Sequence, residues 1–193
     1  MNTDPRSLIV LCGMDGSGKS LLVDRLKAFF QSYGLPATSI HAHTYTTAKT
    51  TFNSDEQTVK KYRLFWRLLI PFAFFDNLLT YFLQYRRAKR PGIIISDRYF
   101  YDKVVRLLYY KICPRWLAKI YLNSIPKPDH LFFLDVAASV AIKRKGEYNR
   151  VEQEKFRKHY LYAAKILKAP VINTGETIDK CISKIVTILD KKL

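Results

Sequence analysis

The chain has 193 residues, enough for a domain with a sizeable core, and 48% of them are hydrophobic, which excludes an intrinsically disordered protein. Lys and Arg number 33 against 16 Asp and Glu, so the formal net charge is +17 and favours nucleotides, nucleic acid or anionic lipid as partners. The three cysteines lack metal-ligand spacing and argue against a disulfide framework. Together with an N-terminus that is unlike a secretory signal, they predict a reducing, cytoplasmic setting. Since there is no helix-turn-helix, zinc-finger or RNA-binding signature, we expect no specific nucleic-acid partner.

A glycine-rich stretch separates the first predicted strand, residues 8–11, from a helical pattern of apolar residues over 21–30. Its residues Gly13-x-x-x-x-Gly18-Lys19-Ser20 have the spacing of a phosphate-binding loop, in which backbone N–H groups surround a polyphosphate. Lys19 would contact the β- and γ-phosphates, the Ser20 hydroxyl would bind Mg²⁺, and the helix N-terminus would attract the anion. A glycine-rich turn that only caps the helix is the alternative. The predicted nucleotide-binding residues are Gly13, Asp15, Gly16, Ser17, Gly18, Lys19, Ser20 and Leu21.

Strand-like and helical stretches alternate along the rest of the chain. Strands are predicted at residues 38–44, 93–96, 131–134 and 171–173, and helical stretches at 59–90, 99–123, 136–168 and 178–192. This alternation predicts an α/β fold in one domain over residues 1–193, with a parallel sheet of about five strands and helices on both faces. The ligand site should lie at the carboxyl ends of the strands.

Two aspartates follow predicted strands and could serve the phosphate loop as an acidic partner that orients Mg²⁺-bound water. Asp97 follows the run Ile93-Ile94-Ile95-Ser96, and Asp135 follows Leu131-Phe132-Phe133-Leu134. Either one could instead be structural and accept backbone N–H groups. We favour Asp97, because Arg98 follows it directly and phosphoryl transfer needs a cation beside the metal ligand.

A basic segment, residues 143–156, places Lys143, Arg144, Lys145 and Arg150 around Gly146. A solvated helical face is the ordinary interpretation of such a run. The glycine that interrupts it favours a hinged lid, about residues 143–152, that closes over a nucleotide and excludes water.

Two further patterns have an ordinary and a functional interpretation. His41 and His43 share one face of a strand, but with no third ligand in view we expect no metal site. The apolar run over residues 64–85 contains Arg67, Pro71 and Asp76, which argue against a membrane-spanning helix. We expect core helices there, with a surface for a membrane or a partner protein as the alternative.

Several of these motifs resemble the thymidylate kinase family in order and spacing. They are the phosphate loop with its internal Asp15, the Asp97-Arg98-Tyr99 triplet, the stretch "KPDHLFFLDVAASVAIKRKGEYNRVEQEKF" and the stretch "VINTGETIDKCISKI". The pattern covers roughly residues 6–36 and 91–190. The resemblance implies a three-layer P-loop kinase fold, ATP and Mg²⁺ as donor and cofactor, and a homodimer.

The resemblance also implies roles for single residues. Asp15 would face the acceptor sugar, Arg98 would hold the acceptor phosphate, and Asp97 and Ser20 would lie at the metal. Because the phosphate loop has Gly16 and Ser17 where some members carry a basic residue, the lid must supply the transition-state cation, with Arg144, Lys145 and Arg150 as candidates. The predicted catalytic residues are Lys19, Asp97, Arg98, Arg144 and Arg150.

The middle of the chain departs from the family pattern in the region that would bind the acceptor base. Phe72 and Phe74 can stack on a base, but Asn77 or a neighbour stands where an arginine is expected, and Asp102 lies where a serine is expected. The predicted acceptor-binding residues are Asp15, Phe72, Phe74, Asn77, Arg98 and Tyr99. The sequence thus predicts ATP-dependent phosphorylation of a nucleoside monophosphate, above all dTMP. The alternatives are another acceptor at a membrane surface, or an ATP-binding module without this activity.

Overall fold

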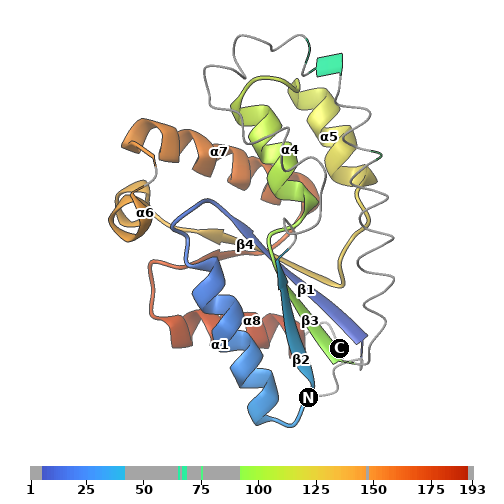
Figure 1. Cartoon of the computed structure of the whole chain (residues 1–193), viewed down its shortest axis with the longest axis vertical. Coiled ribbons are helices and arrows are strands. Elements are labelled where there is room, and N and C mark those ends of the chain that lie inside the picture. The colour runs from blue at the N-terminus through green and yellow to red at the C-terminus, as the bar shows by residue number, and fades with distance from the viewer. Residues whose placement is uncertain are drawn as a thin grey trace.

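The computed structural model describes residues 6–41, 65, 67–68, 75, 92–146 and 148–190. Their centre is a parallel sheet of β1 (Arg6–Gly13), β2 (Ala37–His41), β3 (Gly92–Asp97), β4 (His130–Asp135) and β5 (Val171–Asn173), in the order β2-β3-β1-β4-β5 (Figure 1). The register sets Leu11 of β1 and His41 of β2 level with Asp97 of β3, so the carboxyl ends of three strands meet at one edge.

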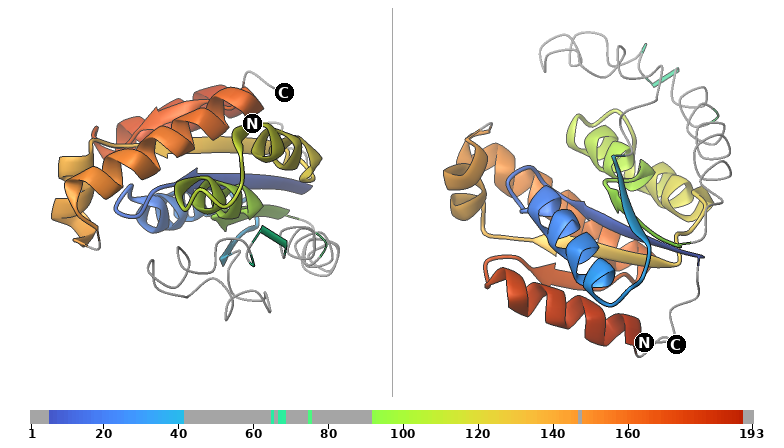
Figure 2. Two further views of the ribbon diagram at one scale, coloured as in Figure 1. Left: turned by 90° about the horizontal axis from the view of Figure 1, so that it is seen from above. Right: turned by 60° about the horizontal axis from the view of Figure 1, so that its bottom comes forward.

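Helices cover both faces of the sheet (Figure 2). One hydrophobic core packs α1 (Lys19–Ser32) and α8 (Ile178–Asp190) on one face, and a second packs α4 (Phe100–Tyr109), α5 (Arg115–Ser124) and α7 (Arg150–Leu167) on the other. β1 contributes to both cores, because successive strand residues point to opposite faces: Ile9 and Leu11 belong to the first core, Val10 and Cys12 to the second. The three-layer α/β fold predicted from the sequence is confirmed.

Two predicted helical stretches are each broken by a residue in the left-handed region. The stretch 99–123 is divided into α4 and α5 where Lys111 has φ 55°. The stretch 136–168 is divided into α6 (Ala138–Lys145) and α7 at Gly146, which has φ 66° and follows the last residue of α6. Most of the predicted helical stretch 59–90, together with His43, lies outside the described residues.

The described residues include all three cysteines but only four positions of the apolar run 64–85. Cys12, Cys113 and Cys181 are buried free thiols. In the part of the chain that the structure describes, no helix combines the length and the apolar character needed to cross a bilayer.

Candidate active site

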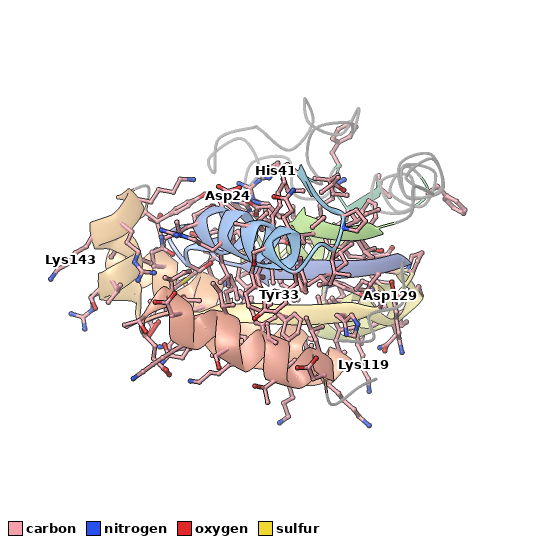
Figure 3. All side chains as sticks on the ribbon, turned by 90° about the horizontal axis from the view of Figure 1, so that it is seen from below. Asp24, Tyr33, His41, Lys119, Asp129 and Lys143 are labelled. Carbon is pink, nitrogen blue, oxygen red and sulfur yellow. The ribbon has the colours of Figure 1, made fainter. Side chains whose placement is uncertain are left out.

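A cavity of about 360 Å³ opens at the carboxyl ends of β1, β2 and β3. It is lined by Asp15, Gly16, Gly18, Lys19, Ser20, Leu21, His41, Asp97, Arg98, Arg144 and Lys145. His41 lies at the end of β2, whereas Lys143 of α6 points away from the sheet (Figure 3). The fold therefore brings most residues of the predicted phosphate loop, both members of the Asp97-Arg98 pair and two cations of the predicted lid, Arg144 and Lys145, to one cavity.

The backbone of the phosphate loop needs its glycines. Gly16 and Gly18 have φ of 82° and 80°, which side chains other than glycine rarely adopt. A Cβ on Gly16 would also lie 2.4 Å from the carbonyl oxygen of Ala141, so the loop packs directly against α6. The N-cap residue of α1, Gly18, makes no side-chain cap hydrogen bond, which leaves the first N–H groups of that helix available to an anion.

Lys19 is folded back onto the loop that carries it. Its side chain is only 6% exposed, and Nζ donates to the carbonyl oxygens of Gly13 at 2.7 Å and Met14 at 2.8 Å. Burial lowers the pKa of Lys19, and the nearby charge of Arg98 lowers it further. The ammonium is thus held at the cavity wall, where a phosphate can replace the two carbonyls as its partner.

Ser20 and Asp97, the predicted metal ligands, are in direct contact. Ser20 Oγ donates to Asp97 Oδ2 at 2.8 Å, and Nδ1 of His41 lies 3.6 Å from the same oxygen. Asp97 is 6% exposed, and in the described part of the chain its Oδ1 is buried without a hydrogen-bond partner. A hydroxyl and a carboxylate with an unsatisfied oxygen are hard donors that fit Mg²⁺. Among the described residues no cluster of three His, Cys, Asp or Glu side chains could hold a metal by itself, so a metal there would need oxygens of a ligand or water.

Arg98 and Asp15 form an ion pair at the floor of the cavity. Arg98 Nη2 donates to Asp15 Oδ1, and Lys145 Nζ lies 3.8 Å from the same oxygen. Burial alone would raise the pKa of Asp15, but the charges of Arg98, Lys19 and Lys145 outweigh it and hold that pKa below its ordinary value. Arg98 itself has φ 73°, and its backbone N–H donates to the carbonyl of Leu11, which fixes the turn after β3.

Arg144 lines both this cavity and a second one. Its Nη2 donates to the carbonyl oxygen of Thr174 at 3.0 Å. The second cavity, of about 180 Å³, is lined by Gly18, Leu21, Leu22, Arg144, Thr174, Glu176, Ile178 and Cys181. Arg150, the other predicted catalytic lid residue, is exposed at the first position of α7 and lines neither cavity.

Asp97 and Asp135, the two candidate acidic partners of the phosphate loop, have different hydrogen-bond partners. Asp135 accepts two hydrogen bonds from Arg157, from Nε at 2.7 Å and from Nη2 at 2.8 Å. Its carboxylate is therefore occupied by a bidentate ion pair that joins β4 to α7, and it does not line the cavity. This geometry is that of a structural aspartate.

Tyr99 does not fit the acceptor-binding role predicted for it. Its side chain is 1% exposed within the core under α4, and its hydroxyl donates to the carbonyl oxygen of Pro126 at 2.8 Å. Arg98, which precedes it, has φ 73°, and Tyr99 is the N-cap residue of α4. The other residues predicted for the base, Phe72, Phe74 and Asn77, lie outside the described residues.

Three residues near the site were not predicted to belong to it. His41 lines the cavity, and Gln153 donates from Nε2 to the backbone oxygen of Asp15 at 3.4 Å. Asp102 is buried in the first turn of α4 and accepts the backbone N–H of Tyr99, the residue after Arg98. The sequence held one usable signal for Gln153: with Phe156 and Tyr160 it recurs at helical spacing on the buried face of α7.

The fold and this cavity define the class of protein: a P-loop phosphotransferase, in which a glycine-rich loop before a helix faces an Asp-Arg pair at the end of a neighbouring strand. The family model for thymidylate kinase matches residues 11–185. The chain therefore belongs to the thymidylate kinase family and is a nucleotide-binding phosphotransferase.

Curated relatives and solved structures agree with this assignment. The chain is 24% identical over 194 residues to a probable thymidylate kinase of Saccharolobus solfataricus, covering 97% of this chain and 99% of that protein. It is 26% identical over 166 residues to one of Methanosphaera stadtmanae, covering 83% and 85%. The structure of thymidylate kinase from Candida albicans superposes with a TM-score of 0.64 at 21% identity, covering 96% of this chain and 92% of that one, which supports the fold.

Proposed function

We propose that this chain transfers the γ-phosphoryl group of ATP to dTMP and releases ADP and dTDP. The observation that carries the proposal is that Lys19, Ser20, Asp97 and Arg98 line one cavity together with the phosphate loop. Such a cavity can hold two phosphorylated ligands end to end, and the reaction needs positioning and charge stabilisation but no covalent intermediate.

The two cavities suit the two ends of ATP. The phosphates would lie against the N-terminus of α1 and Lys19, at the larger cavity. The base would enter the smaller cavity, where Leu21, Leu22 and Ile178 offer apolar surface to a flat ring. Gly18, Leu21 and Arg144 line both cavities, so one nucleotide can occupy the two at once.

Ser20 and Asp97 would hold the cofactor Mg²⁺. The metal would neutralise charge on the β- and γ-phosphates when bound. The chain's own contribution is to keep a hydroxyl and a carboxylate 2.8 Å apart on two elements, α1 and β3, that the sheet holds rigidly. Their mutual hydrogen bond keeps both side chains in place.

The acceptor phosphate would bind Arg98, and the acceptor sugar would face Asp15. Because Arg98 and Asp15 are paired in the structure, an incoming phosphate would replace the carboxylate as the partner of the guanidinium and leave Asp15 to accept from a sugar hydroxyl. For the base we keep the prediction of Phe72, Phe74 and Asn77.

Arg144 is the lid cation that we assign to the transition state. Arg144 lines the phosphate cavity, and its guanidinium is held by the hydrogen bond to the Thr174 carbonyl oxygen. Lys145, the neighbouring cation, is instead paired with Asp15. Arg150 would contribute only after a movement of the lid. A cation delivered to the transferring phosphoryl group can accelerate the reaction by about 10³-fold or more.

Two variants of matched chemistry test these roles. Asp97→Asn removes the carboxylate beside Ser20, and Asp135→Asn removes the carboxylate paired with Arg157 outside the cavity. We expect a loss of turnover of at least about a hundredfold in Asp97→Asn, because the metal site loses its charge, and a loss of stability with nearly unchanged turnover in Asp135→Asn. Equal turnover in the two variants would contradict the assignment of the site.

We also propose that the enzyme is a homodimer. Large apolar side chains at Phe65, Leu68, Phe75, Trp116 and Ile120 are exposed in the single chain, as expected for a surface that a second copy covers. Sedimentation equilibrium gives the mass directly, and a monomer at micromolar concentration would reject this proposal. Flotation with anionic vesicles tests the remaining alternative, contact with a membrane.

A further inference from the structure

His41 is a half-exposed histidine at the end of β2, where it lines the larger cavity (Figure 3). It pairs in register with Asp97 on the neighbouring parallel strand, so the two side chains leave the sheet on the same face. Its Nδ1 lies 3.6 Å from Asp97 Oδ2, the oxygen that also accepts the Ser20 hydroxyl at 2.8 Å. An imidazole, a carboxylate and a hydroxyl from β2, β3 and α1 therefore lie together at one place in the cavity.

The spacing of these three groups suits ligands of a single metal ion. Metal–ligand bonds of about 2.0–2.2 Å place neighbouring ligand atoms about 3.0–3.4 Å apart, the smaller value for an octahedral ion and the larger for a tetrahedral one. The separations of 2.8 and 3.6 Å lie on either side of this range, so small side-chain rotations would bring all three groups to one ion. Asp97 Oδ1 is buried and has no hydrogen-bond partner within the described residues, so this carboxylate has ligand capacity to spare.

The ordinary role for His41 would be a hydrogen bond that holds Asp97. The 3.6 Å between Nδ1 and Oδ2 is too long for one, because N–H···O bonds have N–O distances of about 2.7–3.2 Å. We propose that His41 binds, through an imidazole nitrogen, the same divalent cation as Ser20 and Asp97, and that it strengthens the binding of Co²⁺ and Mn²⁺ more than that of Mg²⁺. This inference rests on the metal site of the proposed function.

The direction of this selectivity follows from ligand chemistry. Mg²⁺ prefers oxygen ligands and gives up its water reluctantly, whereas a nitrogen ligand favours transition ions, Co²⁺ more than Mn²⁺. Of the described residues that line the cavity, four are Lys or Arg and two are Asp, so a bare metal ion is repelled there. The metal should therefore arrive on the phosphates of a nucleotide, and a neutral imidazole adds a ligand without adding charge.

The first test looks for the nitrogen directly, in a complex with Mn²⁺ and ADP that needs no acceptor and undergoes no transfer. Electron spin-echo envelope modulation of Mn²⁺ detects nitrogen bound to the ion. Protein whose histidines alone carry ¹⁵N separates a histidine signal from one of the adenine ring. We expect ¹⁴N coupling in the unlabelled wild type, its replacement by ¹⁵N coupling in the labelled protein, and its loss in His41→Gln. A wild-type spectrum without histidine coupling overturns the proposal, and so does coupling that persists in His41→Gln.

The second test measures the affinities for Co²⁺–ADP and Mg²⁺–ADP by calorimetry. Glutamine is similar in size to histidine and keeps an N–H that can reach Asp97, so His41→Gln separates the loss of a metal ligand from the loss of a hydrogen bond. We expect Co²⁺–ADP to bind about tenfold more weakly or worse, the scale of losses at metal sites, and Mg²⁺–ADP to change by less than about twofold. Equal weakening for the two metals would overturn the proposal, because His41 would then support the site without binding the ion.

His159→Gln is the matched control. His159 is a half-buried histidine of α7 that lines neither cavity, so its replacement should change neither the spectra nor the two affinities. If His41→Gln does not fold, the wild-type spectra with labelled and unlabelled histidine still decide whether a histidine binds the ion. A protein that shows the histidine coupling with Mn²⁺ and ADP but transfers no phosphoryl group to dTMP would reject the proposed acceptor and retain the role of His41.

Discussion

Replacement of Lys19 by alanine separates the chemical role of this side chain from its structural one. The ammonium is 6% exposed and makes its two short hydrogen bonds, 2.7 and 2.8 Å, to carbonyl oxygens of its own loop. In Lys19→Ala those carbonyls can turn to water in the cavity that Lys19 lines, so we expect the free energy of unfolding to change by less than about 2 kcal/mol. The loss to catalysis should be larger, because the ammonium would contact charge that develops on the transferring phosphoryl group. Removal of one such donor from a preorganised site costs about 3–4 kcal/mol, so we expect kcat to fall by about 10³-fold.

The assay couples ADP release to a spectroscopic signal under saturating ATP and dTMP, with urea unfolding on the same protein sample. Arg25→Ala is the control, since Arg25 carries the same charge on the same helix but is exposed and outside the cavity. It should retain wild-type turnover and stability. The reasoning is refuted when Lys19→Ala retains more than about a tenth of the wild-type kcat, or when it loses activity only because it has unfolded.

The other predictions concern the lid, an ion pair, pH and the acceptor. Arg144→Ala should lower kcat about a hundredfold and the affinity for ATP only a few-fold, because the contact is made chiefly in the transition state; equal losses in rate and binding would make it a simple clamp. Arg157→Ala should lower the free energy of unfolding by about 1–2 kcal/mol in urea titrations, with KM values unchanged, since the partly exposed pair with Asp135 joins β4 to α7. The pKa of Asp15 is held below its ordinary 3.8, so its stabilising contribution is present above that pH and is lost as pH falls through the lower, folded value; Asp15→Asn should therefore flatten the stability curve below about pH 4, and an unchanged slope would contradict the ion pair with Arg98. Because Phe72 and Phe74 would bind the base mainly by stacking and the expected arginine is missing, initial rates with dUMP should lie within about tenfold of those with dTMP. A strict preference for dTMP would mean that a polar group such as Asn77 recognises the base through hydrogen bonds.

The sheet and the phosphate loop could be predicted because their signals are local. The apolar runs of β1 and β4 contribute to both hydrophobic cores, and Ile93 and Ile95 of β3 contribute to one of them. A glycine pattern of this spacing between a strand and a helix is typical of a phosphate-binding loop. Asp97 and Arg98 could be placed for the same reason, since residues that directly follow neighbouring parallel strands meet at one edge.

What could not be predicted depends on contacts between distant segments. Nothing local marks Asp135 as the partner of Arg157, 22 positions away, or turns Tyr99 into the core while Arg98 faces the cavity. The sequence singled out Asp102 only as a departure from a family pattern. Its complete burial depends on the packing of α4 against α7, where the Tyr160 hydroxyl donates to its carboxylate. Nothing in the sequence favoured Arg144 over Arg150 as the lid cation. The structure places them on different helices, because α6 ends before the left-handed Gly146, and of the two only Arg144 lines the cavity.

The central claim is tested most directly by following the labelled phosphoryl group. Purified protein is incubated with γ-labelled ATP, Mg²⁺ and dTMP, and the products are separated by anion-exchange chromatography. The account predicts that the label moves from ATP into dTDP in amounts equal to the ADP formed, and that Asp97→Asn and Lys19→Ala abolish this transfer. Release of labelled inorganic phosphate without dTDP, or transfer of the label to thymidine or a lipid alcohol in preference to dTMP, would contradict it.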